Sequence, residues 1–257
     1  MRHSGVWHPR LDCEQPILYL PASGTTLTGR GLGPDWAGDG VAVVSHPTPA
    51  SGFTTQFRRT RFTSAASADN ELGVHLPNAA DMSCYRGATT SRGGFFFRAL
   101  FMVNAIPNTT IRFFAGLSAQ TSGVCLSNTV PANTVGLWCD TTDAGSLTVV
   151  TNDASAGSST KNALASAHTL TAGTLYEFTM QSNPAQGSIV TQLVNKGTDA
   201  VIGSQNVSAT MPATTTMMGP QVGLSNAANA AGGDTSLDII LIYARPNLKL
   251  VPDGSGT

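Results

Sequence analysis

The sequence predicts an all-β protein built as an antiparallel sandwich or barrel. Short apolar or alternating segments follow one another at short, regular spacing along most of its 257 residues. Turn-forming Gly, Pro, Asn and Asp residues separate these segments, as they do between antiparallel strands. No amphipathic helical window of useful length interrupts the pattern, and the best helix candidate, residues 161–170, is equally typical of a polar strand. Together these features indicate a sandwich or a barrel.

The composition supports the same fold class. Charged residues make up 11% of the chain, against about 25% in typical soluble domains. Small neutral residues take their place, which is typical of a turn-rich β protein and not of a disordered chain, since the latter carries more charge. The length allows one large β domain with an extension, or two small domains, and a sizeable core.

The central strand is expected over residues 93–104, which read GGFFFRALFMVN. The run is too short to span a membrane, and its length suits a strand better than a helix. If side chains alternate along it, Phe96, Arg98 and Leu100 share one face. The other face is the better core candidate and carries Phe95, Phe97, Ala99 and Phe101. We expect a contact between protomers on the face that carries Arg98.

The remaining strands are predicted from short apolar runs bounded by turns. Before the central strand they are expected at 41–44, 53–62, 71–76 and 82–86. After it they are expected at 111–117, 134–139, 146–151, 175–181, 188–193, 200–207, 221–224 and 237–244.

Residues 1 to about 40 differ in texture from the rest. They are rich in Pro and Gly with scattered aromatics, and only residues 17–20 hint at a strand. We weigh two alternatives equally: an attachment arm that orders against a partner, and an irregular extension folded back on its own domain. The expected organisation is therefore an arm over residues 1–50, a sandwich over 51–247 and a flexible tail over 248–257. Pro16 makes the start of the chain a poor signal peptide.

The charge balance argues against two classes of partner. The net charge is −1, with no basic stripe. Neither nucleic-acid binding nor docking on an anionic membrane is expected, because both depend on basic residues. Arg58, Arg59 and Arg61 form the one basic cluster, expected either at a solvated edge or in an ion pair between subunits.

The four cysteines are Cys13, Cys84, Cys125 and Cys139. None forms a CxxC pair, and no histidine spacing supports a zinc site. Cys125 and Cys139 flank a plausible hairpin and a disulfide between them is one alternative, but scattered buried thiols are the commoner outcome.

Motifs for catalysis or metal binding are weak. The chain has no Gly-x-Ser-x-Gly nucleophile motif, and its histidines (His3, His8, His46, His75, His168) are dispersed, as surface or turn residues are. The three glutamates, Glu14, Glu71 and Glu177, show no pairing suited to glycoside hydrolysis. Residues 140–145 carry two aspartates before a Gly turn, as calcium loops do, but lack the closing glutamate. We expect no enzyme activity, no cofactor and no metal.

Nine segments, taken in order, resemble the C-terminal domain of bacteriophage tail-fibre and related virion proteins. They are FRRTRFTSAASA (57–68), CYRG (84–87), GGFFFRALF (93–101), FFAGLSA (113–119), VGLWCD (135–140), TNDASAG (151–157), LYEFTMQ (175–181), MPATTTMMGPQVGLSN (211–226) and LDIILIYA (237–244). The resemblance covers about residues 53–245. It departs from the family pattern at Cys84-Tyr85, where bulkier aromatics are expected.

The resemblance implies a lectin-like jelly-roll sandwich in a virion structural protein. A short tail fibre or receptor-binding protein is expected, more in the tail than in the head, forming a homotrimer. It would join other virion proteins through the N-terminal arm and contact a bacterial surface glycan or protein. The alternatives are a capsid decoration or head-fibre protein with a purely structural role and, third, a polysaccharide-degrading tailspike.

A lectin-like site would combine a surface aromatic ring with Asn or Asp side chains that bind sugar hydroxyls. Trp138 beside Asp140, with Asn152 and Asp153 on a following loop, are the candidates. The alternative, which the strand around it favours, makes Trp138 a core residue.

Overall fold

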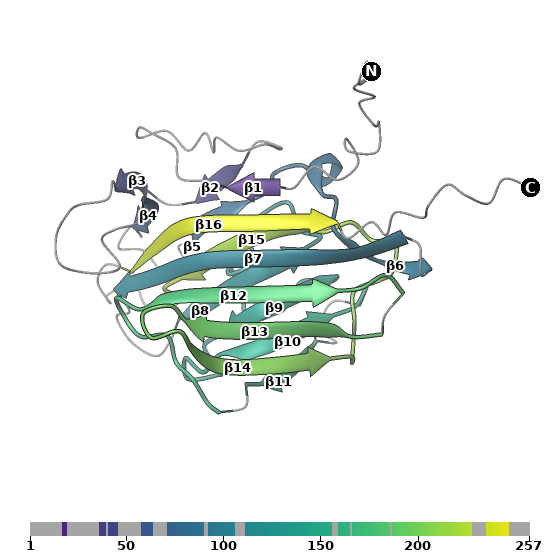
Figure 1. Ribbon diagram of the computed structural model, residues 1–257. Helices are drawn as coiled ribbons and strands as arrows, with labels where there is room; N and C mark the ends of the chain where they lie inside the picture. Colours follow the sequence, from purple (N-terminus) through teal and green to yellow (C-terminus); the bar gives the residue numbers. More distant parts are fainter. Residues whose placement is uncertain are drawn as a thin grey trace, which may run out of the picture.

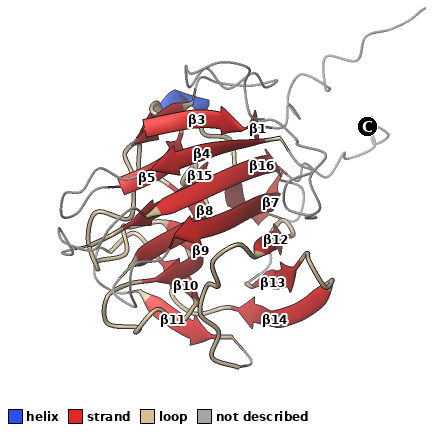
Figure 2. Cartoon of the chain, turned by 90° about the vertical axis from the view of Figure 1, so that its left-hand side faces the viewer, coloured by secondary structure: helices blue, strands red, loops and turns tan. Residues whose placement is uncertain are grey.

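The protein is a sandwich of two antiparallel sheets, as predicted. Figure 1 shows sheet A in front of sheet B, and Figure 2 gives the view turned by 90°. This computed structural model describes residues 17–19, 36–39, 41–45, 58–63, 71–89, 92–105, 111–155, 159–164, 166–185, 187–227 and 235–246. Among these residues no helix is long and apolar enough to span a bilayer; η3 (Ala79–Asp81) is a single 3₁₀ turn.

Sheet A has nine strands, in the order β14-β13-β12-β7-β16-β4-β3, with β1 beside β16 and β6 beside β7. Their bounds are β1 (Ile17–Tyr19), β3 (Val41–Ser45), β4 (Arg59–Thr63), β6 (Tyr85–Thr89), β7 (Arg92–Ala105), β12 (Leu175–Ser182), β13 (Ile189–Asn195), β14 (Ala200–Val207) and β16 (Ser236–Pro246).

Sheet B has seven strands, in the order β11-β10-β9-β8-β15-β5-β2. Their bounds are β2 (Ala37–Asp39), β5 (Glu71–His75), β8 (Arg112–Ser118), β9 (Thr134–Cys139), β10 (Thr148–Asn152), β11 (Thr160–Ala163) and β15 (Gly219–Ser225). The start of the ambiguous stretch 161–170 thus belongs to a strand, β11. Strands β7 and β8 follow each other in sequence but lie in different sheets. The chain therefore crosses from sheet A to sheet B between them.

Strand β7 has the alternation that the sequence predicts. Phe95, Phe97, Ala99 and Phe101 are fully buried between the sheets. The ring of Phe101 lies 4.8 Å from that of Phe113 on β8, and the ring of Phe97 lies 6.3 Å from that of Phe178 on β12. Phe96 and Arg98 face outward and are half-buried. Leu100 shares their face but is only 9% exposed, because Leu175 and Ile240 pack against it.

The glycine pair before the three phenylalanines has a backbone reason. Gly93 and Gly94 have φ angles of +90° and +81°, which other residues adopt only at a cost. A Cβ atom on Gly94 would lie 2.6 Å from the carbonyl oxygen of Ser182. The pair therefore lets the start of β7 lie close against Gly87 of β6 and the end of β12.

The described parts of residues 1–50 belong to the sandwich. Strand β1 pairs with β16, β2 with β5 and β3 with β4. Tyr19 and Trp36 lie in the core with their rings 5.4 Å apart, and the Tyr19 hydroxyl donates to Thr60 Oγ1 at 2.9 Å. The division of the chain into an arm over residues 1–50 and a sandwich over 51–247 stays a prediction. The rest of 1–50 and the expected tail, 248–257, lie outside the described residues.

Candidate functional site

The predicted aromatic of the glycan site is a core residue. Trp138 points away from the space between the sheets, yet it is fully buried, because residues 119–133, which we call the covering segment, fold over the outer face of sheet B. It belongs to a second, smaller core made of Phe114, Val124, Cys125, Val130, Trp138 and Val150. Its Nε1 donates to Asp140 Oδ2 at 3.3 Å. The ring therefore offers no face on which a sugar could stack. Trp138 is a core residue, which is the alternative that its strand favours in the sequence.

Four strands of sheet B anchor the covering segment. Glu71 on β5 accepts a hydrogen bond from the backbone N of Cys125 at 3.1 Å. Gln221 on β15 donates to the carbonyl of Gln120 at 2.6 Å. Arg112 on β8 donates to Asn128 Oδ1 at 2.8 Å, and Asn152 on β10 donates to the carbonyls of Val130 and Pro131 at 2.8 and 2.9 Å. The predicted glycan residue Asn152 is thus fully buried and holds the segment in place.

The remaining candidates do not join Trp138 in one site. Asn152 on β10 lies opposite Thr134 on β9, whereas Trp138 lies opposite Thr148. The four residues from Thr148 to Asn152 separate the two positions by about 13 Å along the strand. Asp153 is half-buried, and its Oδ1 accepts the backbone N–H of Ser155 at 2.7 Å, as a turn residue does.

Asp140 forms an ion cluster with Asp143 and Lys161. The Lys161 ammonium lies 2.7 Å from Asp140 Oδ2 and 2.8 Å from Asp143 Oδ1. Burial raises the pKa of Asp140, but hydrogen bonds from Lys161, Thr142 and Trp138 outweigh it and leave that pKa below its usual value. Burial lowers the pKa of Lys161, but its bonds to the two carboxylates leave it raised. In residues 140–145, the stretch that resembles a calcium loop, the Lys161 ammonium lies between the carboxylates of Asp140 and Asp143. Among the described residues, no group of His, Cys, Asp and Glu side chains is arranged to hold a metal ion.

The described cysteines are buried free thiols. Cys139 faces the main core and Cys125 the second core, so the disulfide alternative does not hold. Burial raises the pKa of Cys84 and of Cys139 to about 12, which makes both thiols unreactive. Cys13 lies outside the described residues.

The described histidines and glutamates do not gather in one cluster. His75 is buried in β5, contrary to the expected surface position, and His168 lies 3.3 Å from the Tyr176 hydroxyl; His3, His8, His46 and Glu14 lie outside the described residues. Glu71 lies in sheet B, under the covering segment. Glu177 lies in sheet A, where its Oε1 is 3.0 Å from Arg98 Nε.

The arginine cluster differs from both of its expected settings. Arg59 Nε lies 2.6 Å from Asp238 Oδ2, and Arg61 Nε lies 2.7 Å from Asp238 Oδ1. Asp238 is fully buried and its hydrogen bond raises the pKa of Arg61. The two arginines therefore join β4 to β16 within one chain.

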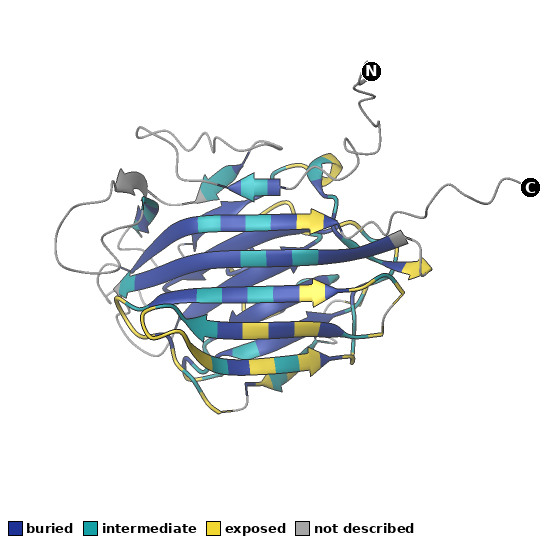
Figure 3. Cartoon of the chain, in the orientation of Figure 1, coloured by how far each residue is buried: buried dark blue, intermediate teal, exposed yellow. Residues whose placement is uncertain are grey.

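The outer face of sheet A carries the other candidate site. On β12, β13 and β14, buried and exposed positions alternate, as Figure 3 shows, and the exposed side chains point away from sheet B. Cross-strand pairing places Gln192 between Thr179 and Ser204. One row along, it places Gln181 between Phe96 and Val190. We call this surface, over β7, β12, β13 and β14, the open face.

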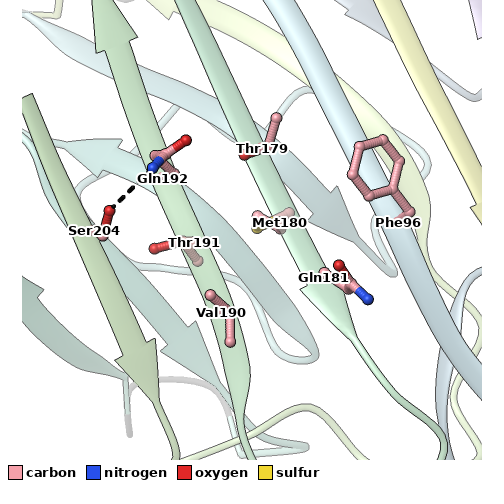
Figure 4. A pocket seen from close by; sticks show the side chains of 8 residues that line it. All are labelled: Phe96, Thr179, Met180, Gln181, Val190, Thr191, Gln192 and Ser204. Carbon is pink, nitrogen blue, oxygen red and sulfur yellow. Dashed lines mark hydrogen bonds between the residues drawn. The ribbon is translucent and has the colours of Figure 1, made fainter. Parts of the chain in front are cut away.

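A solvent-open depression of about 210 Å³ lies on the open face, toward the end of β12 and the start of β13. Its lining residues come from four adjacent strands and are Phe96, Thr179, Met180, Gln181, Val190, Thr191, Gln192 and Ser204. In Figure 4, Phe96 on β7 stands at one side and Ser204 on β14 at the other. Gln192 Nε2 donates to Ser204 Oγ and Gln181 Nε2 to Asn183 Oδ1, both at the long distance of 3.4 Å.

The residues beside the depression are aromatic or charge-paired. The rings of Phe96 and Tyr243 lie 6.1 Å apart and are tilted by 59°. Arg98, opposite Thr179, forms the ion pair with Glu177, and Lys196 Nζ lies 3.9 Å from Glu177 Oε2. The sequence indicated the outward face of β7 but missed the amide and hydroxyl side chains that continue it on β12 to β14, since such residues are common on any solvent-facing strand.

No family model and no curated protein matches the chain in sequence. Solved structures do match in fold. A protein of unknown function from Shewanella oneidensis MR-1 has a TM-score of 0.58 at 13% identity, over 91% of this chain and 85% of that chain. Arcelin-5, a lectin-like defense protein from Phaseolus vulgaris, has a TM-score of 0.53 at 10% identity, over 92% of this chain and 100% of that chain. Peanut lectin, in a structure with a 9mer peptide, has a TM-score of 0.52 at 11% identity, over 92% of this chain and 98% of that chain.

These comparisons define the class of fold. The chain is a lectin-like jelly-roll sandwich of two antiparallel sheets. At identities of 10 to 13% the likeness concerns the fold alone.

Proposed function

We propose that this chain is a structural protein of a bacteriophage virion, a short tail fibre or receptor-binding protein whose sandwich contacts the host cell surface. We also propose that it acts as a homotrimer and joins other virion proteins through its N-terminal residues. Two independent features support the proposal: the ordered resemblance of nine segments to tail-fibre domains, and the lectin-like sandwich.

One observation carries the binding role. The covering segment closes the outer face of sheet B, and its anchors (Glu71, Arg112, Asn152 and Gln221) are buried. Sheet A instead presents exposed amide and hydroxyl side chains around a depression. A binding role without catalysis is the function that this surface supports best. Glu177, two residues before the lining residue Thr179 on β12, is the acidic residue beside the depression, and its carboxylate forms an ion pair with Arg98.

The proposal predicts that the purified chain binds intact host cells. Fluorescently labelled protein should bind the cells that the phage infects in a saturable way, as measured by flow cytometry. An excess of unlabelled protein should slow the adsorption of phage to those cells. Antibodies against the chain should label the tail in electron micrographs of particles.

A different result would identify the structural alternative. If the folded protein binds no host cells and the antibodies label the capsid shell, the chain is a decoration or head-fibre protein, and the receptor-binding proposal is wrong.

A further inference from the structure

Resting on the proposed function, we infer that the depression on the open face binds an uncharged polysaccharide chain that runs across β14, β13, β12 and β7. The inference depends on three properties of the lining: its hydrogen-bonding groups, its exposed apolar side chains and its lack of charge.

The hydrogen-bonding groups suit sugar hydroxyls. Gln181 and Gln192 each carry an amide with two N–H donors and one acceptor oxygen. The hydrogen bonds that these amides donate to Asn183 and Ser204 are 3.4 Å long, so each amide can turn toward a ligand and lose only a weak contact. Neighbouring hydroxyls on a sugar ring can then accept from the amide nitrogen and donate to the amide oxygen. Thr179 and Ser204 add hydroxyls that can do either.

The apolar side chains suit the faces of sugar rings. Phe96 is half-exposed at one end of the depression, and Val190 is 54% exposed within it. A pyranose ring is polar at its rim and apolar on its faces, so one ring can lie on Phe96 or Val190 while its rim reaches the amides. Such alternation of apolar and polar groups fits a carbohydrate better than a lipid.

Charge decides between classes of polysaccharide. None of the eight lining residues is ionisable at neutral pH. The charged groups of Arg98, Glu177 and Lys196, beside the lining, pair with one another or with Asp199. Arg245, opposite Phe96 on β16, is exposed beyond the lining. An acidic chain would therefore find no cation inside the depression, whereas an uncharged chain needs none.

The shape of the site favours a polymer. The depression is open to solvent and does not enclose a ligand, as sites for small apolar molecules do. Its lining spans four strands, which is about 14 Å at the usual strand spacing. This length accommodates several sugar units in a row. Of the eight lining residues only Phe96 and Met180 belong to the aromatic, Met and Arg types that enrich the centres of protein interfaces, and Met180 is buried, so we favour a glycan over a second protomer.

The experiment uses the full chain and an array of bacterial oligosaccharides, some uncharged and some carrying uronic acids. The unmodified protein should bind uncharged oligosaccharides. Calorimetry with the best uncharged oligosaccharide should show that Gln181→Ala and Gln192→Ala each weaken binding about tenfold, as loss of hydrogen bonds worth about 1.4 kcal/mol predicts. Gln120→Ala is the matched control, since its exposed side chain lies on the other side of the sandwich, and should leave the affinity unchanged.

Each other outcome overturns the inference. Unchanged affinity in a Gln181→Ala, Gln192→Ala double variant of unchanged melting temperature places the site elsewhere. Binding of acidic oligosaccharides alone, lost in Arg245→Gln, shows an anionic ligand. A change of oligomeric state in native mass spectrometry, with no change in glycan affinity, shows that the open face is a contact between protomers. If the protein binds host cells but its variants bind them equally, the inference fails while the proposed function stands; absence of cell binding by the unmodified protein contradicts the proposed function itself.

Discussion

Replacing Phe97 by Asp is expected to unfold the sandwich, whereas the same change at the neighbouring Phe96 leaves it folded. The Phe97 ring is fully buried and packs against Phe178. Its loss removes apolar contacts and places an unpaired carboxylate in the core, at a combined cost of about 5 kcal/mol or more. This approaches the whole free energy of unfolding of a typical domain, about 5 to 15 kcal/mol.

The Phe96→Asp variant is the control for that experiment. The Phe96 side chain faces outward beside Tyr243, so a carboxylate there remains in contact with water. Urea unfolding followed by tryptophan fluorescence measures both variants. Equal tolerance of the two substitutions would contradict the assignment of the two faces of β7.

Replacing Asp238 by Ala is expected to lower the free energy of unfolding by about 3 kcal/mol, because a fully buried carboxylate that two arginines share is removed. Arg59 and Arg61 would then lose the carboxylate that each of them contacts. Since β4 joins sheet A through β16 at this point, β4 and the edge strand β3 beyond it should loosen first. Urea unfolding measures the loss, and amide hydrogen exchange locates it.

Asp199→Ala provides a matched control for this prediction. Asp199 is 75% exposed and pairs with Lys196 at the surface, where ion pairs contribute little to stability. If both variants lose equal stability, the Arg–Asp cluster does not hold β4 in place.

Much of the fold could be predicted from local patterns. Alternation in β7 identified its buried face, because side chains of a strand point alternately to its two sides. The strand at 17–20 was only hinted at, and β2 was missed, because such short strands gain their stability from partners far along the chain. β1 pairs with β16, about 225 residues away.

The candidate site could not be predicted in the same way. Trp138 resembles a surface aromatic only if the covering segment is ignored, and that segment has no strand or helix period. Its anchors act across long sequence separations, from Glu71 to Cys125 and from Gln221 to Gln120. Which outer face stays open is therefore decided by tertiary contacts. Gln181 and Gln192 lie in different strands and become neighbours only through the register of β12 and β13.

The central claim, that the open face of sheet A meets the host surface, is tested most directly by the side-chain amide resonances of the protein in ¹⁵N NMR spectra. Fragments of the host's isolated surface polysaccharide would be the titrant. We expect the amide signals of Gln181 and Gln192 to shift with saturation, while those of Gln120 and Asn152 stay in place. Shifts confined to Gln120 or Asn152, on the side of sheet B, would contradict the claim.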